Sequence, residues 1–186
     1  MTPYSLAFYL DVITTGTVLG AKPTDTPDRV TDILGAGFAE NSFDKHSMWR
    51  DYGMAEFFWD RRKGQLPWKG HHFTLQVHRL PWGGETVNSR VRERYGRFER
   101  HLRFDRLEQL LGRRGVHLED VPDANAPDYS LHWQPSSQVA VMVRRTPEEG
   151  GRRRGRSRVG DVHAIYSSLS ADMVAWHRSH YGSPDR

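Results

Sequence analysis

Ten histidines are the residues of this sequence best suited to chemistry, because imidazole is a common metal ligand and a general acid or base near neutral pH. His71, His72 and His78 lie in or beside one stretch, and the others are scattered. None has a partner at the H-x-x-x-H or H-E-x-x-H spacing of a zinc-binding helix. Adjacent strand residues point to opposite faces, so His71 and His72 are not expected to share an ion. We predict no metal site and histidines that make ordinary hydrogen bonds.

Motifs for nucleophilic catalysis and phosphate binding do not occur in the sequence. There is no G-x-S-x-G or G-x-x-x-x-G-K-[ST] motif, and with no cysteine there is no thiol nucleophile, disulfide or iron–sulfur ligand. Asp51, Glu56 and Asp60 could act as paired carboxylates, but Glu56 stands among apolar residues. We expect it to pair with an arginine such as Arg79 on a neighbouring strand. We therefore predict no catalytic residue and no cofactor, with an unrecognised histidine-dependent enzyme as an alternative.

Positive charge is concentrated in one segment. The chain has 27 Lys and Arg against 23 Asp and Glu, a net charge of +4. Residues 144–158 alone carry a net charge of +5, which leaves the rest of the chain near neutrality. Residues 147–160 contain almost no apolar side chain, so we predict a solvated loop there. The alternative is an arm that binds nucleic-acid phosphates through Arg152, Arg153, Arg154, Arg156 and Arg158.

Six tryptophans are many for 186 residues. Trp59 and Trp133 fall in predicted strands and are expected in the core. Trp68 and Trp82 each follow a proline beside a predicted strand, where they could cap the core or contact a partner. The candidate partner-contact residues are Asp44, Trp49, Asp51, Trp68 and Trp82.

Helix signals occur twice, 77 residues apart. Thr26 can cap a helix that starts at Pro27 and ends before Gly35, with one apolar side. A similar apolar pattern precedes Gly112. At the same offset, the pair Asp51-Tyr52 aligns with the pair Asp128-Tyr129. A polar loop is expected between each helix and its Asp-Tyr pair, where a strand begins. This internal repeat predicts a duplicated α+β unit.

Alternating and apolar stretches predict the strands. Residues 52–59 are apolar on both faces and should form a central strand, and 73–78 alternate and should pair with them. Residues 139–143 and 162–167 should form a hairpin across the arginine-rich loop. A helix is expected around 6–13, an amphipathic helix over 87–102 that bends at Gly96, and a last helix capped by Ser170.

We therefore predict an α+β fold, with packed helices on an antiparallel sheet built from two similar helix–loop–strand–strand units. The first unit spans 1–80, a linker and connecting helix span 81–104, and the second unit spans 105–186 with the arginine-rich loop at 147–160, all in one compact domain. Mean hydropathy is −0.74, and no apolar run is long enough to span a membrane. With no secretory signal either, we expect a cytoplasmic protein.

The segments at 34–35, 48–59 and 73–80 together resemble immunity-type proteins of bacterial polymorphic and contact-dependent toxin systems. The likeness covers about residues 20–80 and consists of a helix that ends in Leu-Gly, a Tyr-Gly strand with aromatic and acidic residues, and an alternating strand. It implies a non-enzymatic protein that binds a cognate toxin and occludes it. Acids near one strand rim (Glu40, Asp44, Asp51 and Asp60) would complement a basic toxin.

Overall fold

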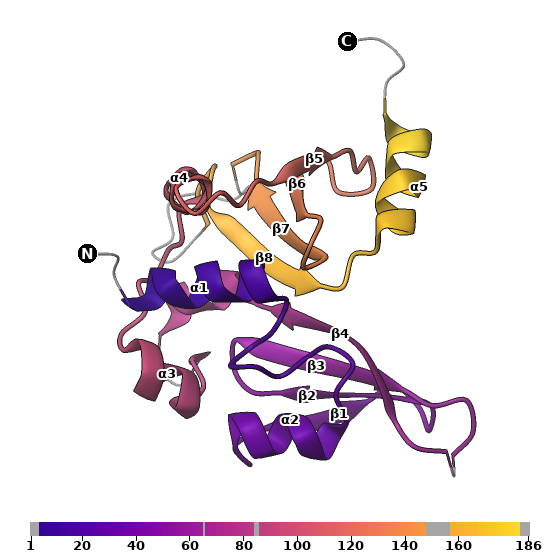
Figure 1. Cartoon of the computed structure of the whole chain (residues 1–186). Coiled ribbons are helices and arrows are strands. Elements are labelled where there is room, and N and C mark those ends of the chain that lie inside the picture. The colour runs from indigo at the N-terminus through magenta and orange to yellow at the C-terminus, as the bar shows by residue number, and fades with distance from the viewer. Residues whose placement is uncertain (1–3, 65, 84–85, 148–156, 183–186) are drawn as a thin grey trace.

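Eight strands form one antiparallel sheet in the order β1-β2-β3-β4-β8-β7-β6-β5 (Figure 1). The computed structural model describes residues 4–64, 66–83, 86–147 and 157–182. The strands are β1 (Ala39–Ser42), β2 (Ser47–Asp51), β3 (Ala55–Asp60), β4 (Lys69–Leu75), β5 (Glu119–Val121), β6 (Tyr129–Gln134), β7 (Val139–Arg144) and β8 (Val162–Ser167). The helices are α1 (Tyr4–Thr15), α2 (Pro27–Leu34), η1 (Val77–Trp82, a 3-10 helix), α3 (Ser89–Tyr95), α4 (Phe104–Gly112) and α5 (Ala171–Tyr181). The α+β class with an antiparallel sheet is as predicted.

The inner face of the sheet carries the main core beneath α1, α2 and α4. Trp59 on β3 donates its indole N–H to the carbonyl of Asp25 at 2.7 Å, just before α2. Phe104 at the start of α4 stacks on His132 of β6. Ala55, Phe57 and Trp59 of β3 are buried in this core, which is why β3 is apolar on this face.

The outer face is covered over only one half of the sheet. Helix α5 lies on β5 and β6 above a second, smaller apolar cluster that includes Trp133, whose indole N–H donates to the carbonyl of Leu169 at 2.8 Å. Helix η1 packs beside β8, where His78 stacks on His163. Over β2 to β4 this face is partly open, since Trp49, Phe58 and His72 are only half-buried, whereas Arg79 of η1 covers Glu56 of β3.

Helix α2 begins as the sequence predicts. The hydroxyl of Thr26 accepts a hydrogen bond from the N–H of Arg29, and Pro27 occupies the first turn. Ser170 caps α5 in the same way through the N–H of Met173. The predicted helix over 87–102 is shorter than expected, because Gly96 adopts a φ of +71° and ends α3 there.

The prediction of a polar loop from the first helix to Asp51 is wrong, because β1 and β2 lie within it. Met48 of β2 is buried and pairs with Trp59, whereas β1 is an exposed edge strand, which needs no apolar alternation. Residues 52–54 form a tight turn instead of the start of β3, since Gly53 has a φ of +93°. β5 likewise occupies part of the second predicted loop.

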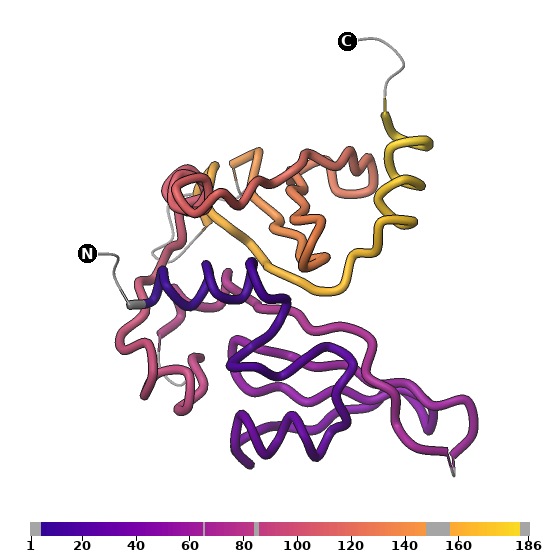
Figure 2. The backbone as a smooth tube through the Cα atoms, viewed as in Figure 1, coloured from indigo at the N-terminus to yellow at the C-terminus, as the bar shows by residue number. Residues whose placement is uncertain are grey.

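The two halves share an order of elements, because α2 with β1 to β4 and α4 with β5 to β8 each run helix first and strands after. Figure 2 shows the earlier and later parts of the chain on the two sides of the central β4–β8 pair. The duplication itself stays a prediction. The offset of 77 places Asp51, the last residue of β2, on Asp128, which precedes β6, so the second sequence match does not align equivalent strand positions.

The predicted hairpin across the arginine-rich loop is confirmed, since β7 pairs antiparallel with β8. Predicted strand 73–78 is present as β4 and pairs with β3, but it ends at Leu75, and Val77 belongs to η1. No helix in the described ranges is both long and apolar enough to cross a membrane.

Candidate functional site

Four rings stand side by side on the open outer face of the sheet. The ring centroids of Phe43 and Trp49 are 4.5 Å apart, those of Trp49 and Phe58 6.2 Å, and those of Phe58 and His72 4.1 Å. The sheet register sets Trp49 opposite Phe58, and Phe58 opposite His72. We call these four residues the aromatic stripe. Phe43 is 81% exposed and the other three are half-buried, so folding leaves the stripe open to solvent.

The turn between β1 and β2 positions Phe43 at the start of the stripe. Asp44 accepts hydrogen bonds through Oδ1 from the N–H groups of His46 at 2.7 Å and Ser47 at 2.9 Å. The bond from His46 is the main cause that lowers the pKa of Asp44. This candidate contact residue therefore has a structural role as well, because its carboxylate holds the turn.

His72 ends the stripe beside His71. A β-bulge makes Phe58 pair with His72 and Trp59 with Gly70, so both imidazoles meet, with their Nδ1 atoms 2.6 Å apart. The expectation that these two side chains point to opposite faces is wrong because of this bulge. Burial first, and the neighbouring His71 second, lower the pKa of His72 to about 4, so its ring is neutral at pH 7.

His71 also approaches Asp60, with its Nε2 3.4 Å from the carboxylate Oδ2. In the ranges that the structure describes, no group of three or more histidine or acidic side chains has the geometry to hold a metal ion.

Glu56 and Arg79 form the predicted ion pair, which is confirmed at 2.6 Å, but Arg79 lies in η1 and not on a neighbouring strand. The Glu56 side chain is 8% exposed and also accepts from the amide of Gln76 at 2.6 Å. Arg79 donates further to Asp51 at 3.0 Å. Burial lowers the pKa of Arg79, but the hydrogen bonds and charges of Glu56 and Asp51 outweigh it and raise that pKa. Asp51 is thus engaged inside the fold.

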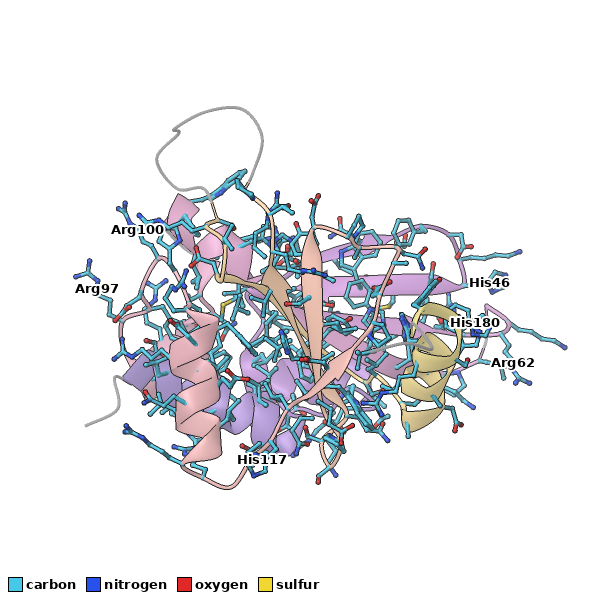
Figure 3. All side chains as sticks on the ribbon, turned by 90° about the horizontal axis from the view of Figure 1, so that it is seen from above. His46, Arg62, Arg97, Arg100, His117 and His180 are labelled. Carbon is cyan, nitrogen blue, oxygen red and sulfur yellow. The ribbon has the colours of Figure 1, made fainter. Side chains whose placement is uncertain are left out.

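Asp44 and Trp68 come together at a hollow of about 760 Å³ on the inner side of β1, next to the start of α2. Arg61 places its guanidinium 4.0 Å from the centroid of the Trp68 ring and donates to the carbonyl of Lys45. A neighbouring hollow is lined by His46 and Arg62, which Figure 3 shows at one end of the molecule, opposite Arg97 and Arg100.

The remaining sequence candidates lie apart from the stripe or outside the described residues. Trp82 is 84% exposed at the end of η1. Arg152, Arg153, Arg154 and Arg156 lie outside the described residues. The side chain of Arg158 is exposed, and its N–H donates to the buried carboxylate of Asp161.

Asp161 is a second buried acid that is fully engaged. It lies 3.0 Å from Nδ1 of His101 and accepts from Arg103 at 3.3 Å. Together with the main chain of residue 158, these groups hold the base of the β7–β8 loop.

Sequence reasoning found Trp49 but missed Phe43, Phe58 and His72 as its companions. The alternation of 54–59 already put Phe58 on the face opposite Phe57. What was lacking was the β2–β3 register, which required β2 to be recognised as a strand.

Comparison with known proteins gives no relative on which to base an assignment. No family model matches the chain, and neither a curated protein nor a solved structure matches it. The site must therefore be interpreted from its own chemistry. A row of partly exposed rings on a rigid sheet can bind an apolar or aromatic surface of another molecule.

Proposed function

We propose that this chain is a non-enzymatic protein-binding protein that neutralises a cognate bacterial toxin by occluding it, and that the aromatic stripe is its contact surface. The observation that carries the proposal is the stripe itself. Aromatic side chains supply large contact areas with few rotatable bonds, which is why they dominate binding energy at protein interfaces. Three of them on sheet strands, with Phe43 in the adjoining turn that Asp44 holds, form a surface that is rigid before the partner arrives.

The buried acids support a binding role over a catalytic one. Glu56 is committed to Arg79 and Gln76, and Asp161 to His101 and Arg103. Each of these carboxylates faces donors that hold neighbouring segments together. In such arrangements the acid stabilises the fold rather than moving a proton.

The test is co-expression with the product of the adjacent gene, followed by co-purification and titration calorimetry. Phe43→Lys, which places a charge in the stripe, and Trp49→Ala, which truncates a ring, should each weaken binding at least about thirtyfold, as expected for changes at hot-spot residues. Phe43 is largely exposed, so its variant should fold normally. Trp176→Ala is the matched control, because Trp176 is also a partly exposed tryptophan stacked on a neighbouring ring, that of His180, but on α5.

Two results would count against the proposal. One is a chain that captures no product of a neighbouring gene and rescues no cell from a toxin. The other is a partner that binds the Phe43 and Trp49 variants as tightly as the parent. Trp68→Ala and Trp82→Ala, tested in the same titration, show whether the contact extends to the other sequence candidates.

A further inference from the structure

We propose that the free edge of strand β1 binds an extended segment of the partner protein, which joins the sheet as an additional antiparallel strand. This inference rests on the proposed function and specifies how the partner is held. Within the described residues, β1 pairs only with β2, and all four of its residues are exposed. An edge of this kind presents main-chain donors and acceptors that another strand can satisfy.

The other edge of the sheet is protected, which makes the contrast informative. Arg178 of α5 donates to the carboxylate of Glu119 at 2.7 Å and to the carbonyl of Asp120 at 3.4 Å. The ring of His177 contacts the carbonyl of Pro122 at 3.2 Å. Strand β5 is thus tied to a helix. β1 contains no proline or lysine, and its one charge, Glu40, is held by Arg50 at 2.9 Å.

The outer side of an added strand would extend the aromatic stripe. Asn41 lies opposite Trp49 in the sheet register, so it shares the outer face, and Phe43 follows it at the next position on that face. Alternate side chains of the incoming strand would therefore lie beside Asn41 and Phe43. Aromatic or apolar residues at those positions would gain cross-strand contacts with the stripe.

The inner side of the added strand would face the hollow beside α2. Glu40 and Ser42 line this hollow together with Asp28 and Asp44. The intervening side chains of the incoming strand would point toward these acids. A site that binds the main chain at an edge and alternate side chains in a hollow has both affinity and sequence preference.

The hollow is lined by three acids and three bases, Lys45, Arg50 and Arg61, so a basic side chain is favoured only by individual carboxylates with free oxygens. Both arginines are already engaged, since Arg50 donates to Glu40 and to the carbonyl of Pro27, and Arg61 to the carbonyl of Lys45. Asp28 makes no hydrogen bond or ion pair within the described residues, and Asp44 uses only Oδ1 for its bonds. We therefore expect a partner segment that alternates aromatic or apolar residues with lysine or arginine.

The direct test uses a short synthetic peptide that alternates phenylalanine and lysine, acetylated and amidated at its ends. Amide hydrogen exchange of the full chain, followed by NMR, should show the outward-directed main-chain amides among residues 39–42 protected at least about tenfold by the peptide. Two control peptides should give no protection. One has the same composition with all phenylalanines first, and the other is methylated at every backbone nitrogen, so that it cannot donate. Protection by either control, or none by the alternating peptide, would overturn the strand addition.

Proline substitutions carry the test to the partner protein. N–H groups alternate in direction along a strand, so either Glu40 or Asn41 directs its N–H outward, away from β2. Proline at that position removes no hydrogen bond to β2, so thermal unfolding of Glu40→Pro and Asn41→Pro identifies the variant that keeps β1 intact. That variant should lose at least about tenfold in partner affinity.

The two proposals can fail separately. Unchanged partner binding by this proline variant, with binding lost on Phe43→Lys, would refute the strand addition and leave the proposed function standing. A failure to capture any partner would refute the proposed function, and the peptide experiment would still decide whether the edge accepts a strand.

Discussion

Removing Arg79 should be the most informative single perturbation of the outer face. Arg79→Met leaves Glu56 buried without its ion-pair partner, and breaking a buried pair in this way typically costs about 3–5 kcal/mol. Arg79 is 34% exposed and Asp51 27% exposed, so water compensates for part of this loss. Gln76 also still donates to Glu56. We therefore expect a decrease of about 2–3 kcal/mol in the free energy of unfolding.

The double variant Glu56→Leu with Arg79→Met separates charge burial from packing. It removes both charges and should lie within about 1 kcal/mol of the parent, because an apolar pair replaces the ion pair. Urea unfolding followed by tryptophan fluorescence at neutral pH measures all variants, with Arg62→Met as the control at an exposed arginine. A loss below about 0.5 kcal/mol for Arg79→Met, or a double variant less stable than Arg79→Met, would refute this reasoning.

Three further predictions concern pH, packing and the arginine-rich loop. Burial, followed by neighbouring charges, lowers the pKa of His72 and His163 to about 4, so both rings are neutral in the folded protein at pH 7. Their contribution to stability is therefore present above pH 6.5, the ordinary pKa of histidine, and is lost as the pH falls toward 4. Because both rings are partly exposed, we expect about 1 kcal/mol from each, and His72→Phe should show a smaller loss by urea unfolding between about pH 7 and pH 4.5 than the parent. Gly70→Ala should lower the free energy of unfolding by about 1–3 kcal/mol, because the added Cβ would clash with the carbonyl oxygens of Pro23 and Asp25. Gly64→Ala is the control, since open space surrounds Gly64, and equal stabilities of the two variants would contradict this prediction. If the chain also binds nucleic acid, its affinity for nucleic acid should fall steeply between about 0.05 and 0.2 M salt, and replacing residues 148–156 by a short glycine linker should abolish the binding. Nucleic-acid binding that changes neither with salt nor with this replacement would rule out the arginine-rich loop as a nucleic-acid site.

Elements with local signals could be predicted from the sequence. The cap at Thr26, the proline after it and the cap at Ser170 specify the starts of α2 and α5 without help from distant residues. The Glu56–Arg79 pair could also be anticipated, because a lone acid among apolar strand residues needs a cationic partner. In each case, a few neighbouring residues decide the outcome.

The edge hairpin could not be predicted, because its strands have no pattern of their own. β1 is polar and exposed throughout, and β2 becomes a strand only through its register with β3. The aromatic stripe depends on that register, since Trp49 and Phe58 are neighbours in space but not in sequence. The bulge that joins His71 to His72 is equally non-local, as it arises from the β3–β4 pairing.

Three of the four acids that suggested electrostatic attraction are engaged within the protein, and the fourth, Asp60, lies beside His71. Glu40 holds Arg50, Asp51 holds Arg79, and Asp44 holds its own turn. Charge should therefore contribute little to partner affinity, which must come from the rings, while one basic side chain in the hollow adds a modest amount. Partner binding should thus weaken less than about tenfold when salt is raised from about 0.05 to 0.5 M, measured by calorimetry. A much steeper dependence would show that charged groups, not the aromatic stripe, dominate the interface.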